Sequence, residues 1–174
     1  MQKKWDVLSK KLIAAGIYRG SRLAPRHLSS RYYAGRAVIR ETCEEMGDRT
    51  ILAYTAIWPT ELPEWSELGT VWVSPELRGN GLVCKLMHAT VNLLDTNFFL
   101  ITDRESVMKA ALQLGFIPAT TQSKPGITRW ASDVGVVCRL PETIYPVSPS
   151  RGDIPPTWAT PERGKRWMFV REKK

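Results

Sequence analysis

The stretch Gly69–Leu94, GTVWVSPELRGNGLVCKLMHATVNLL, decides the fold of this 174-residue chain. Its β-type run Val71–Val73 stops at a Ser-Pro pair, and a long segment with the apolar spacing of a helix begins at Leu82. A short basic, glycine-rich turn, Arg78–Gly81, lies between them. The pattern predicts a strand, a turn and a helix in that order, with the glycines placed where the helix begins.

The turn has the composition of an anion-binding site. A helix N-terminus has free backbone N–H groups and a partial positive charge, so it accepts phosphate or pyrophosphate. Gly79 and Gly81 let the backbone approach a phosphate without Cβ atoms in the way, and Arg78 adds a fixed cation. The glycine spacing matches neither the P-loop nor the Rossmann motif. The alternative is a plain strand–helix turn whose glycines serve geometry alone.

The segment VWVSPELRGNGLV resembles the acyl-CoA binding signature of the GCN5-related N-acetyltransferase (GNAT) superfamily. In that signature, V-x-P-x-x-[QR]-x-x-G-x-[GA], the matching positions here are Val73, Pro75, Arg78 and Gly81. The last position departs from the signature, because Val83 stands where Gly or Ala is usual. The resemblance implies that backbone N–H groups of this turn contact a pyrophosphate. Val83 can still donate its N–H, although its bulk would crowd the diphosphate.

A second segment downstream has the same strand-then-helix order. Phe98–Ile101 has the pattern of a short buried strand, and Thr102–Glu105 that of a T-x-x-E capping box. Apolar residues with i, i+4 spacing mark one face of a helix at about 104–114. We expect Gly115 to end this helix as a left-handed cap, with Phe116 making the hydrophobic contact that follows.

This second segment is similar to the family motif N-x-x-A-x-x-x-Y-x-x-x-G-F in its ending only. Arg104, Val107 and Ala111 stand where the motif has Asn, Ala and Tyr. Two motifs at the expected separation support the resemblance over about residues 50–120. The resemblance implies an α/β fold of the GNAT type, with a mixed, mostly antiparallel sheet that is splayed at the cofactor strand and flanked by helices.

Length and composition indicate one domain over residues 1–174, and the resemblance implies that this domain is GNAT-like. The chain is 43% hydrophobic and 24% charged, as is ordinary for soluble proteins, and no apolar run approaches the roughly 18–20 residues of a membrane span. The interrupted apolar N-terminus does not fit a signal peptide. Cys43, Cys84 and Cys138 lack CxxC spacing and accompanying histidines. We therefore expect reduced thiols, a cytoplasmic protein and no metal site.

The net charge is +8 and the isoelectric point is near 9.6. Attraction to an anionic cofactor is one explanation of this charge, and nucleic-acid binding is the other. Lys and Arg are spread over the N-terminal helix, Arg22–Arg40 and the tail, without a helix-turn-helix, zinc-finger or RNA-binding signature. Nucleic acid as a partner therefore rests on charge alone. A homodimer is a further possibility.

Periodicity and turn residues predict the remaining elements. Upstream of the motif we expect an amphipathic helix at 5–17, a short helix capped by Ser29 or Ser30, strands at 36–43 and 50–58 joined by a turn at 46–48, and a loop at 59–67. From the motif onward we expect strands at 69–73, 98–101 and 117–121, helices at about 80–95 and 104–114, two short strands within 126–140, a Pro-rich surface segment at 141–161 and an added strand at 165–171.

The resemblance implies an acyl-CoA-dependent N-acetyltransferase, which moves an acetyl group from acetyl-CoA to an amine acceptor by direct attack. The acceptor is a small molecule or a protein. No Cys or Ser has an adjacent base, which argues against a covalent intermediate. The alternatives are a catalytically weakened GNAT-fold module that binds CoA or regulates, and an acyltransferase that acts on nucleic acid or a nucleic-acid-bound protein.

The cofactor-binding residues implied by the resemblance lie on the strand end and the turn. They are Val71, Trp72, Val73, Arg78, Gly79, Asn80, Gly81, Leu82 and Val83. The resemblance also assigns an oxyanion contact to a backbone N–H of the cofactor strand, at Val73 or Trp72.

Glu67 is the candidate general base, because the family often has a glutamate near this place that acts through water. Glu61 and Glu64 precede it, interleaved with Trp65, in an acidic and aromatic patch that follows Trp58. Such a patch would suit a cationic amine by charge and by cation–π contact. The alternative is a solvated acidic loop.

The sequence does not single out a general acid. The usual tyrosine is replaced by Ala111, which cannot donate a proton. Tyr54, Tyr145, Cys84 or a water molecule could substitute. We interpret His88 as a solvated or half-packed helix residue. For Cys84, we favour a small packed residue over a functional role.

Overall fold

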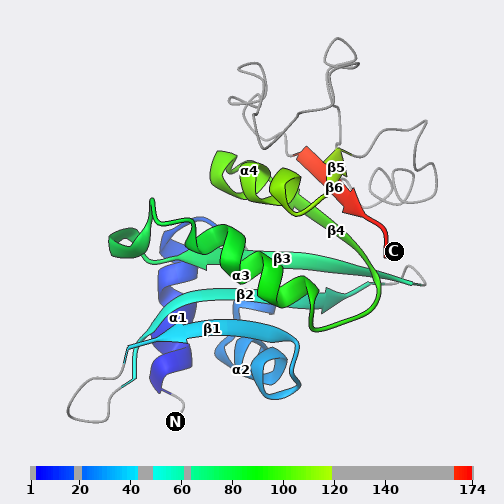
Figure 1. Ribbon diagram of the computed structural model, residues 1–174. Coiled ribbons are helices and arrows are strands. Elements are labelled where there is room, and N and C mark those ends of the chain that lie inside the picture. The colour runs from blue at the N-terminus through cyan, green and yellow to red at the C-terminus, as the bar shows by residue number, and fades with distance from the viewer. Residues whose placement is uncertain (1–2, 18–20, 43–48, 61–63, 119–166, 174) are drawn as a thin grey trace. The chain divides into compact units, whose positions relative to one another are not determined.

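The computed structural model describes residues 3–17, 21–42, 49–60, 64–118 and 167–173 (Figure 1). The helices and strands among them are, in chain order, α1 (Lys3–Ala14), α2 (Pro25–Tyr33), β1 (Ala37–Glu41), β2 (Ile51–Pro59), β3 (Trp65–Val73), α3 (Leu82–Val91), β4 (Asn97–Thr102), α4 (Glu105–Gln113), β5 (Ile117–Pro118) and β6 (Trp167–Arg171). Short 3-10 turns at Ser21–Leu23 and Pro75–Leu77 precede α2 and α3.

The strands are hydrogen-bonded in the order β1-β2-β3-β4-β6-β5. The pairs β1–β2, β4–β6 and β5–β6 are antiparallel, whereas β3 and β4 are parallel. The expected α/β fold with a mixed, mostly antiparallel sheet is therefore confirmed.

The internal contacts divide the chain into two compact units. The first comprises Met1–Pro59 and Leu68–Asp95, and the second comprises Thr60–Glu67 and Thr96–Lys174. Strand β3 contributes residues to both units.

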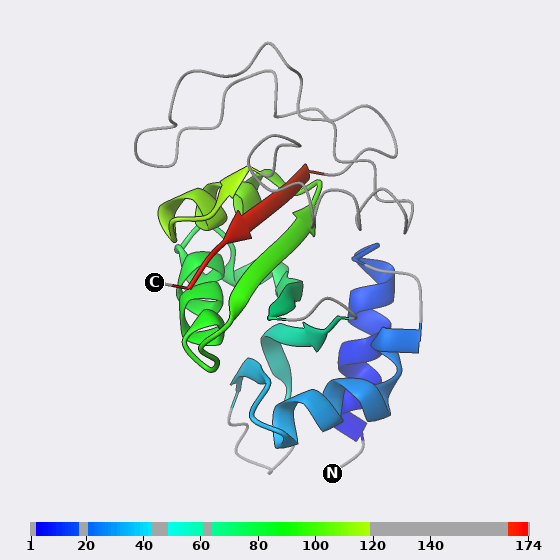
Figure 2. The same cartoon turned by 90° about the vertical axis from the view of Figure 1, so that its right-hand side faces the viewer.

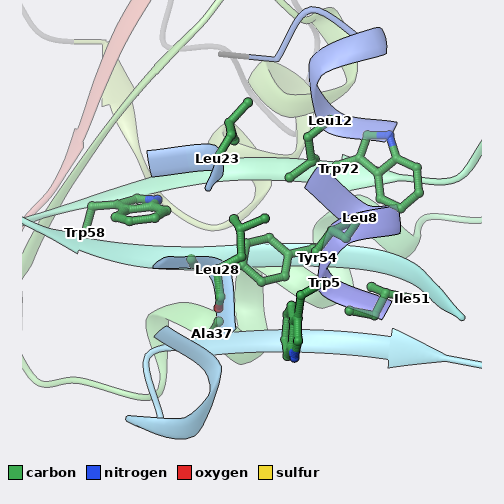
Figure 3. Close-up of a cluster of buried hydrophobic side chains, with 11 residues drawn as sticks. Trp5, Leu8, Leu12, Leu23, Leu28, Ala37, Ile51, Tyr54, Trp58 and Trp72 are labelled. Carbon is green, nitrogen blue, oxygen red and sulfur yellow. The ribbon is translucent and has the colours of Figure 1, made fainter. Parts of the chain in front are cut away.

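In the first unit, α1 and α2 cover one face of β1 and β2, and α3 covers the other (Figures 1 and 2). Side chains alternate along a strand, so Tyr54 and Trp58 of β2 face α1 and α2, whereas Ala53 faces α3. The cluster on the α1–α2 face is drawn in Figure 3. Its members are Trp5, Leu8, Leu12, Leu23, Leu28, Ala37, Ile51, Tyr54, Ala56, Trp58 and Trp72.

Helix α1 is the amphipathic helix expected near the N-terminus. Leu8 and Leu12, one turn apart, are fully buried, while Ile13 is 59% exposed. After the helix, Gly16 has φ +65° and the N–H of Ile17 donates to the Leu12 carbonyl, which closes the last turn.

Helix α2 begins at Pro25, after the N-cap residue Ala24. The expected capping by Ser29 or Ser30 is wrong, because both lie inside the helix. A proline at the first position has its φ already set for a helix and lacks the N–H that a cap would satisfy, so this start needs no serine. The Ser29 hydroxyl instead donates to the Arg26 carbonyl at 3.0 Å.

Strands β1 and β2 confirm the two strands expected upstream of the motif. Their register runs from Ala37 opposite Ala56 to Glu41 opposite Ile51. The Glu41 carboxylate also accepts a hydrogen bond from the Lys4 ammonium, which joins α1 to β1.

Strand β3 begins at Trp65, so residues 65–67 are not part of a loop as expected. Trp65 lies opposite Asn97 of β4, and Glu67 lies opposite Phe99. This pairing, rather than local propensity, extends the strand. Further along, Thr70 has φ +55°, a left-handed backbone conformation that is rare for a β-branched residue.

In the second unit, β6 lies between β4 and β5 (Figure 1). Leu100 of β4 lies opposite Phe169 of β6, and both are buried. The segment 165–171, expected to add a strand, thus contains β6. Burial of Phe169 accounts for its place inside the sheet.

Helix α4 confirms the expected left-handed C-terminal cap but not the expected capping box. Gly115 has φ +78°, and the N–H of Phe116 donates to the Ala111 carbonyl. At the other end Thr102 belongs to β4, and its hydroxyl accepts from the N–H of Arg104 at 3.0 Å. Because Thr102 is the last residue of β4, the N-cap residue of α4 is Arg104. The Arg104 side chain makes no capping hydrogen bond.

Helix α3 ends at Val91, short of the expected 95, and Asn92 follows as its C-cap. The expected turn at 46–48, the strand residues 119–121, the strands within 126–140 and the segment 141–161 lie outside the described residues. Of the described helices, none has the length and apolar character needed to cross a bilayer.

Candidate functional site

Both glycines of the turn between β3 and α3 have left-handed backbone. Gly79 has φ +87°, and Gly81, the residue before α3, has φ +67°. Glycine adopts this conformation without strain, whereas a β-branched residue resists it. A Cβ built on either glycine would meet no atom within 4 Å in the structure. A ligand group can therefore approach the backbone of the turn.

Helix α3 presents its first amide groups without a side-chain cap. Hydrogen bonding along the helix begins with the N–H of Lys85, which donates to the Gly81 carbonyl at 3.2 Å. The N–H groups of Leu82, Val83 and Cys84 lie in the first turn, where a helix has no intrahelical acceptors. These groups and the helix dipole fit a bound phosphate or diphosphate.

Arg78 is held against the end of β3. Its Nε donates to the Val73 carbonyl at 3.2 Å, although the residue itself is exposed. This bond uses one of the five guanidinium donors, so the group is positioned while it retains donors for an anion.

Glu76 adds a negative charge to the same turn. A hydrogen bond from the Ser74 hydroxyl lowers the pKa of Glu76, and its own backbone N–H and the charges of Lys11 and Arg78 lower it further. Glu76 is therefore ionised at neutral pH and offsets part of the Arg78 charge.

Trp72 and Val73 face opposite sides of the sheet. The Trp72 indole lies in the α1–α2 cluster with the Lys11 ammonium 5.7 Å from its ring centroid, whereas Val73 packs on the α3 side. Both side chains belong to the core, so their backbone groups are what they could offer a ligand. Val71 is half-buried and Asn80 is exposed.

The acidic residues before the turn belong to the second unit. Glu67 is half-buried in β3. Glu64 is exposed, and its carbonyl accepts from the Asn97 N–H at 3.1 Å and the Thr96 hydroxyl at 2.8 Å. Glu61 lies outside the described residues. The role of Glu67 as a general base stays a prediction.

The structure argues against Tyr54 as the general acid. Tyr54 is 0% exposed and its hydroxyl donates to the Leu28 carbonyl at 3.2 Å. Burial raises the pKa of Tyr54 well above its usual value, although the Arg31 charge opposes this. Cys84 is a half-buried free thiol in the first turn of α3, and Tyr145 lies outside the described residues.

A network around Trp58 was not predicted from the sequence. The Trp58 Nε1 donates to the Thr70 hydroxyl at 3.0 Å, which joins β2 to the residue of β3 with left-handed backbone. The guanidinium carbons of Arg22 and Arg31 lie 5.3 and 5.6 Å from the Trp58 ring centroid. Cations of the protein itself therefore make the cation–π contacts that the sequence suggested for a cationic amine at Trp58. The four residues belong to separate elements and form no local motif.

Comparisons with known proteins concern the fold. The sequence matches no protein-family model and no curated protein. Among solved structures, it is similar to N-acetylglutamate synthase from Neisseria gonorrhoeae complexed with coenzyme A and N-acetyl-glutamate, with a TM-score of 0.56 and 14% identity over 98% of this chain and 32% of that chain. It is also similar to Rv2747 from Mycobacterium tuberculosis in complex with CoA and NLQ, with a TM-score of 0.53 and 14% identity over 99% of this chain and 95% of that chain.

The chain thus spans about a third of the length of the N-acetylglutamate synthase chain and nearly all of Rv2747. The likeness covers almost every residue of this chain, which agrees with the element order and sheet described above. The chain therefore has the same fold as these two proteins.

Proposed function

We propose that the chain is an acetyl-CoA-dependent N-acetyltransferase. The observation that carries this proposal is the turn before α3, where two glycines with left-handed backbone, an anchored Arg78 and an uncapped helix N-terminus meet. The fold supports it, since both similar solved structures contain coenzyme A.

In this proposal the turn holds the diphosphate of CoA. The N–H groups of Leu82 and Val83 donate to phosphate oxygens, and Arg78 supplies a cation. The side chain of Val83 is larger than the usual Gly or Ala, which would limit how closely the diphosphate approaches. Backbone groups on either side of the bound diphosphate come from Val71, Gly79 and Asn80.

Acetyl-CoA supplies a thioester whose carbonyl carbon accepts the amine. A backbone N–H of Val73 or Trp72 donates to the carbonyl oxygen as negative charge develops there. Glu67 accepts, through a water molecule, the proton that the amine loses as the new C–N bond forms. The C–S bond breaks and the sulfur takes a proton from water, Cys84 or Tyr145.

Calorimetry with CoA tests the binding step, and release of free thiol from acetyl-CoA tests the chemistry. The acceptor panel should include amino acids, polyamines and lysine peptides. We expect CoA to bind and at least one amine to accelerate thiol release. A folded sample that shows neither heat nor thermal stabilisation at millimolar CoA would falsify the proposal.

A second candidate is a CoA-binding module that has lost efficient chemistry. Ala111, at the position of the usual tyrosine, is 0% exposed within α4, and the buried Tyr54 hydroxyl already donates to a carbonyl, so neither supplies the leaving thiolate with a proton. Tight CoA binding without thiol release across the whole panel would favour this module over the enzyme.

A further inference from the structure

Strand β3 contains a residue whose backbone is unusual for a strand. Of the residues of β3, Thr70 alone has a positive φ, +55°, which is rare for a β-branched side chain. One left-handed residue between extended neighbours forms a β-bulge, in which the alternation of the strand is offset by one residue. A strained conformation of this kind persists only where the surrounding structure favours it.

The backbone hydrogen bonds before Thr70 fix the directions in the first part of β3. Asn97 of β4 donates its N–H to the Glu64 carbonyl at 3.1 Å, so this carbonyl points toward β4. The C=O and N–H of a trans peptide point in opposite directions, so the Trp65 N–H points toward β2, the other neighbour of β3. In a regular strand, odd-numbered N–H groups of β3 would therefore point toward β2 and even-numbered ones toward β4.

Past Thr70 the directions are reversed. Ser74, the even-numbered residue directly after β3, donates its N–H to the Leu52 carbonyl of β2 at 2.8 Å. By alternation from Ser74, the Val73 N–H points away from β2, to the opposite edge of the strand. In the described part of the chain, the pairing of that edge with β4 ends at Glu67. The bulge at Thr70 therefore turns the Val73 N–H to an edge of β3 beyond the β4 pairing.

The Trp58 indole favours the left-handed conformation of Thr70. Its Nε1 donates to the Thr70 hydroxyl at 3.0 Å, and Trp58 is 5% exposed at one end of the buried cluster (Figure 3). A return of Thr70 to extended backbone would move its hydroxyl and leave a nearly buried indole N–H without an acceptor, which is unfavourable. Trp58 of β2 thereby offsets the backbone strain of Thr70 in β3.

We propose that Trp58 is a positioning residue for acyl transfer: it holds the left-handed Thr70, which directs the Val73 N–H toward the thioester carbonyl. This inference rests on the proposed function, in which the N–H of Val73 or Trp72 stabilises the oxyanion, and it selects Val73. The Trp72 N–H points toward β2 by the same alternation. Trp58 itself contacts no reacting atom in this arrangement.

A matched pair of ligands measures this contact without an acceptor. S-ethyl-CoA has a methylene group where acetyl-CoA has its carbonyl, so the ratio of the two Kd values reports the hydrogen bond to the carbonyl oxygen. Calorimetry on the parent should show acetyl-CoA bound about three- to tenfold more tightly, as one hydrogen bond predicts. Trp58→Phe should bind both ligands nearly equally and keep the Kd for CoA. Its kcat for thiol release should fall while its KM for acetyl-CoA changes little.

Trp5→Phe is the matched control. Trp5 is a tryptophan of the same buried cluster, 2% exposed, and its Nε1 has no hydrogen-bond partner among the described residues. The substitution removes the same atoms from the same core, so it should lower the stability without changing the ratio of the two Kd values.

Glycine at position 70 separates the backbone conformation from the hydrogen bond. Glycine adopts left-handed backbone without strain and needs no bond from Trp58 to do so. Thr70→Gly should therefore keep the Kd ratio of the parent, although the indole N–H loses its acceptor and the stability falls. The double variant Trp58→Phe, Thr70→Gly should recover the ratio that Trp58→Phe loses. A tryptophan that only stabilised the fold would not be rescued in this way.

The Cα and Cβ chemical shifts of Thr70 give a readout that needs no ligand. In Trp58→Phe they should move toward the values of extended backbone, whereas in Trp5→Phe they should stay as in the parent. Absence of CoA binding by the parent would refute the proposed function, while the Thr70 shifts would still test the hold of Trp58 on this conformation.

Four results would overturn the inference. They are unchanged Thr70 shifts in Trp58→Phe, a CoA-binding parent without preference for acetyl-CoA, an equal loss of preference in Trp5→Phe and Trp58→Phe, and a double variant that does not recover the preference.

Discussion

At Gly81 the chain takes a left-handed backbone immediately before α3, and no atom stands within 4 Å of a Cβ built there. Gly35, after α2, has nearly the same φ, +66°, and the same open surroundings. Gly81→Val and Gly35→Val should therefore each lose about 1–2 kcal/mol of stability through backbone strain. Only Gly81→Val places a branched side chain in the path of the diphosphate, so only it should nearly abolish CoA binding.

Denaturant unfolding and CoA calorimetry on both glycine variants check this expectation. If Gly81→Val binds CoA as the parent does while Gly35→Val shows the same loss of stability, the cofactor turn has been misplaced.

Glu67 is predicted to act on the amine and not on the cofactor. Glu67→Gln should keep the Kd for CoA and lower kcat/KM for thiol release, most strongly toward pH 6, where the amine is least often neutral. Toward pH 9 the amine is more often neutral and the two enzymes should converge. Parallel profiles of kcat/KM against pH would remove Glu67 from the reaction.

Glu76 should make the folding stability of the chain slightly dependent on pH in the acid range. Hydrogen bonding to Ser74 holds the pKa of Glu76 below its ordinary value of 4.5 in the folded chain. The stabilisation is therefore present above pH 4.5 and is lost as the pH falls through the lower, folded value. The Tm difference between the parent and Glu76→Gln should be constant near neutral pH and shrink in acid. A constant difference down to pH 3 would contradict this cause.

At the scale of elements, a side-chain hydrogen bond joins Trp58 of β2 to Thr70 of β3. Thr70 is the residue of β3 that has left-handed backbone. Trp58 is 5% exposed, so Thr70→Val leaves a nearly buried indole N–H without its acceptor and should cost about 1–3 kcal/mol. The β-branched shape, and with it the backbone strain, is retained in this variant. Trp58→Phe removes the donor instead.

The double variant Trp58→Phe, Thr70→Val should be less destabilised than the two single changes together, by about 1 kcal/mol. Urea unfolding of the four proteins measures this coupling. Additive losses would show that the hydrogen bond contributes nothing of its own.

Elements whose determinants are contiguous in sequence could be predicted. Helix α4 ends at Gly115 and Phe116 as the local pattern indicated, because the cap depends on six neighbouring residues. Thr102 has the local pattern of a helix cap, but its place in β4 depends on pairing with Trp167. Trp65 has the local pattern of a loop residue, but its strand pairing is with Asn97, far along the chain.

The candidate site divides in the same way. The turn from Arg78 to Val83 could be predicted, since a run of consecutive residues contains both its geometry and its donors. The arginines on Trp58 could not, because Arg22, Arg31 and Thr70 meet it only after three separate elements have packed. Before folding they are indistinguishable from any other basic or polar residues.

At the scale of the whole molecule, the charge of +8 should make CoA binding dependent on salt. The Debye length falls from about 10 Å at 0.1 M to 3 Å at 1 M, so salt screens the attraction of the protein for phosphates. The Kd for CoA should rise several-fold between about 0.05 and 0.5 M NaCl. Pantetheine, which has no phosphate, is the control and should show little change. An equal response of the two ligands would contradict an electrostatic contribution.

Strand β6 lies between β4 and β5, although residues 119–166 separate it in sequence from β5. During synthesis the ribosome therefore releases β4 and β5 long before the strand that joins them. Until 167–171 emerge, the apolar run Phe98–Leu100 has an unpaired edge, the kind of segment that associates with other nascent chains. Pairing over such a sequence distance is also slow. The second unit should therefore be the slow-folding and chaperone-dependent part of this chain.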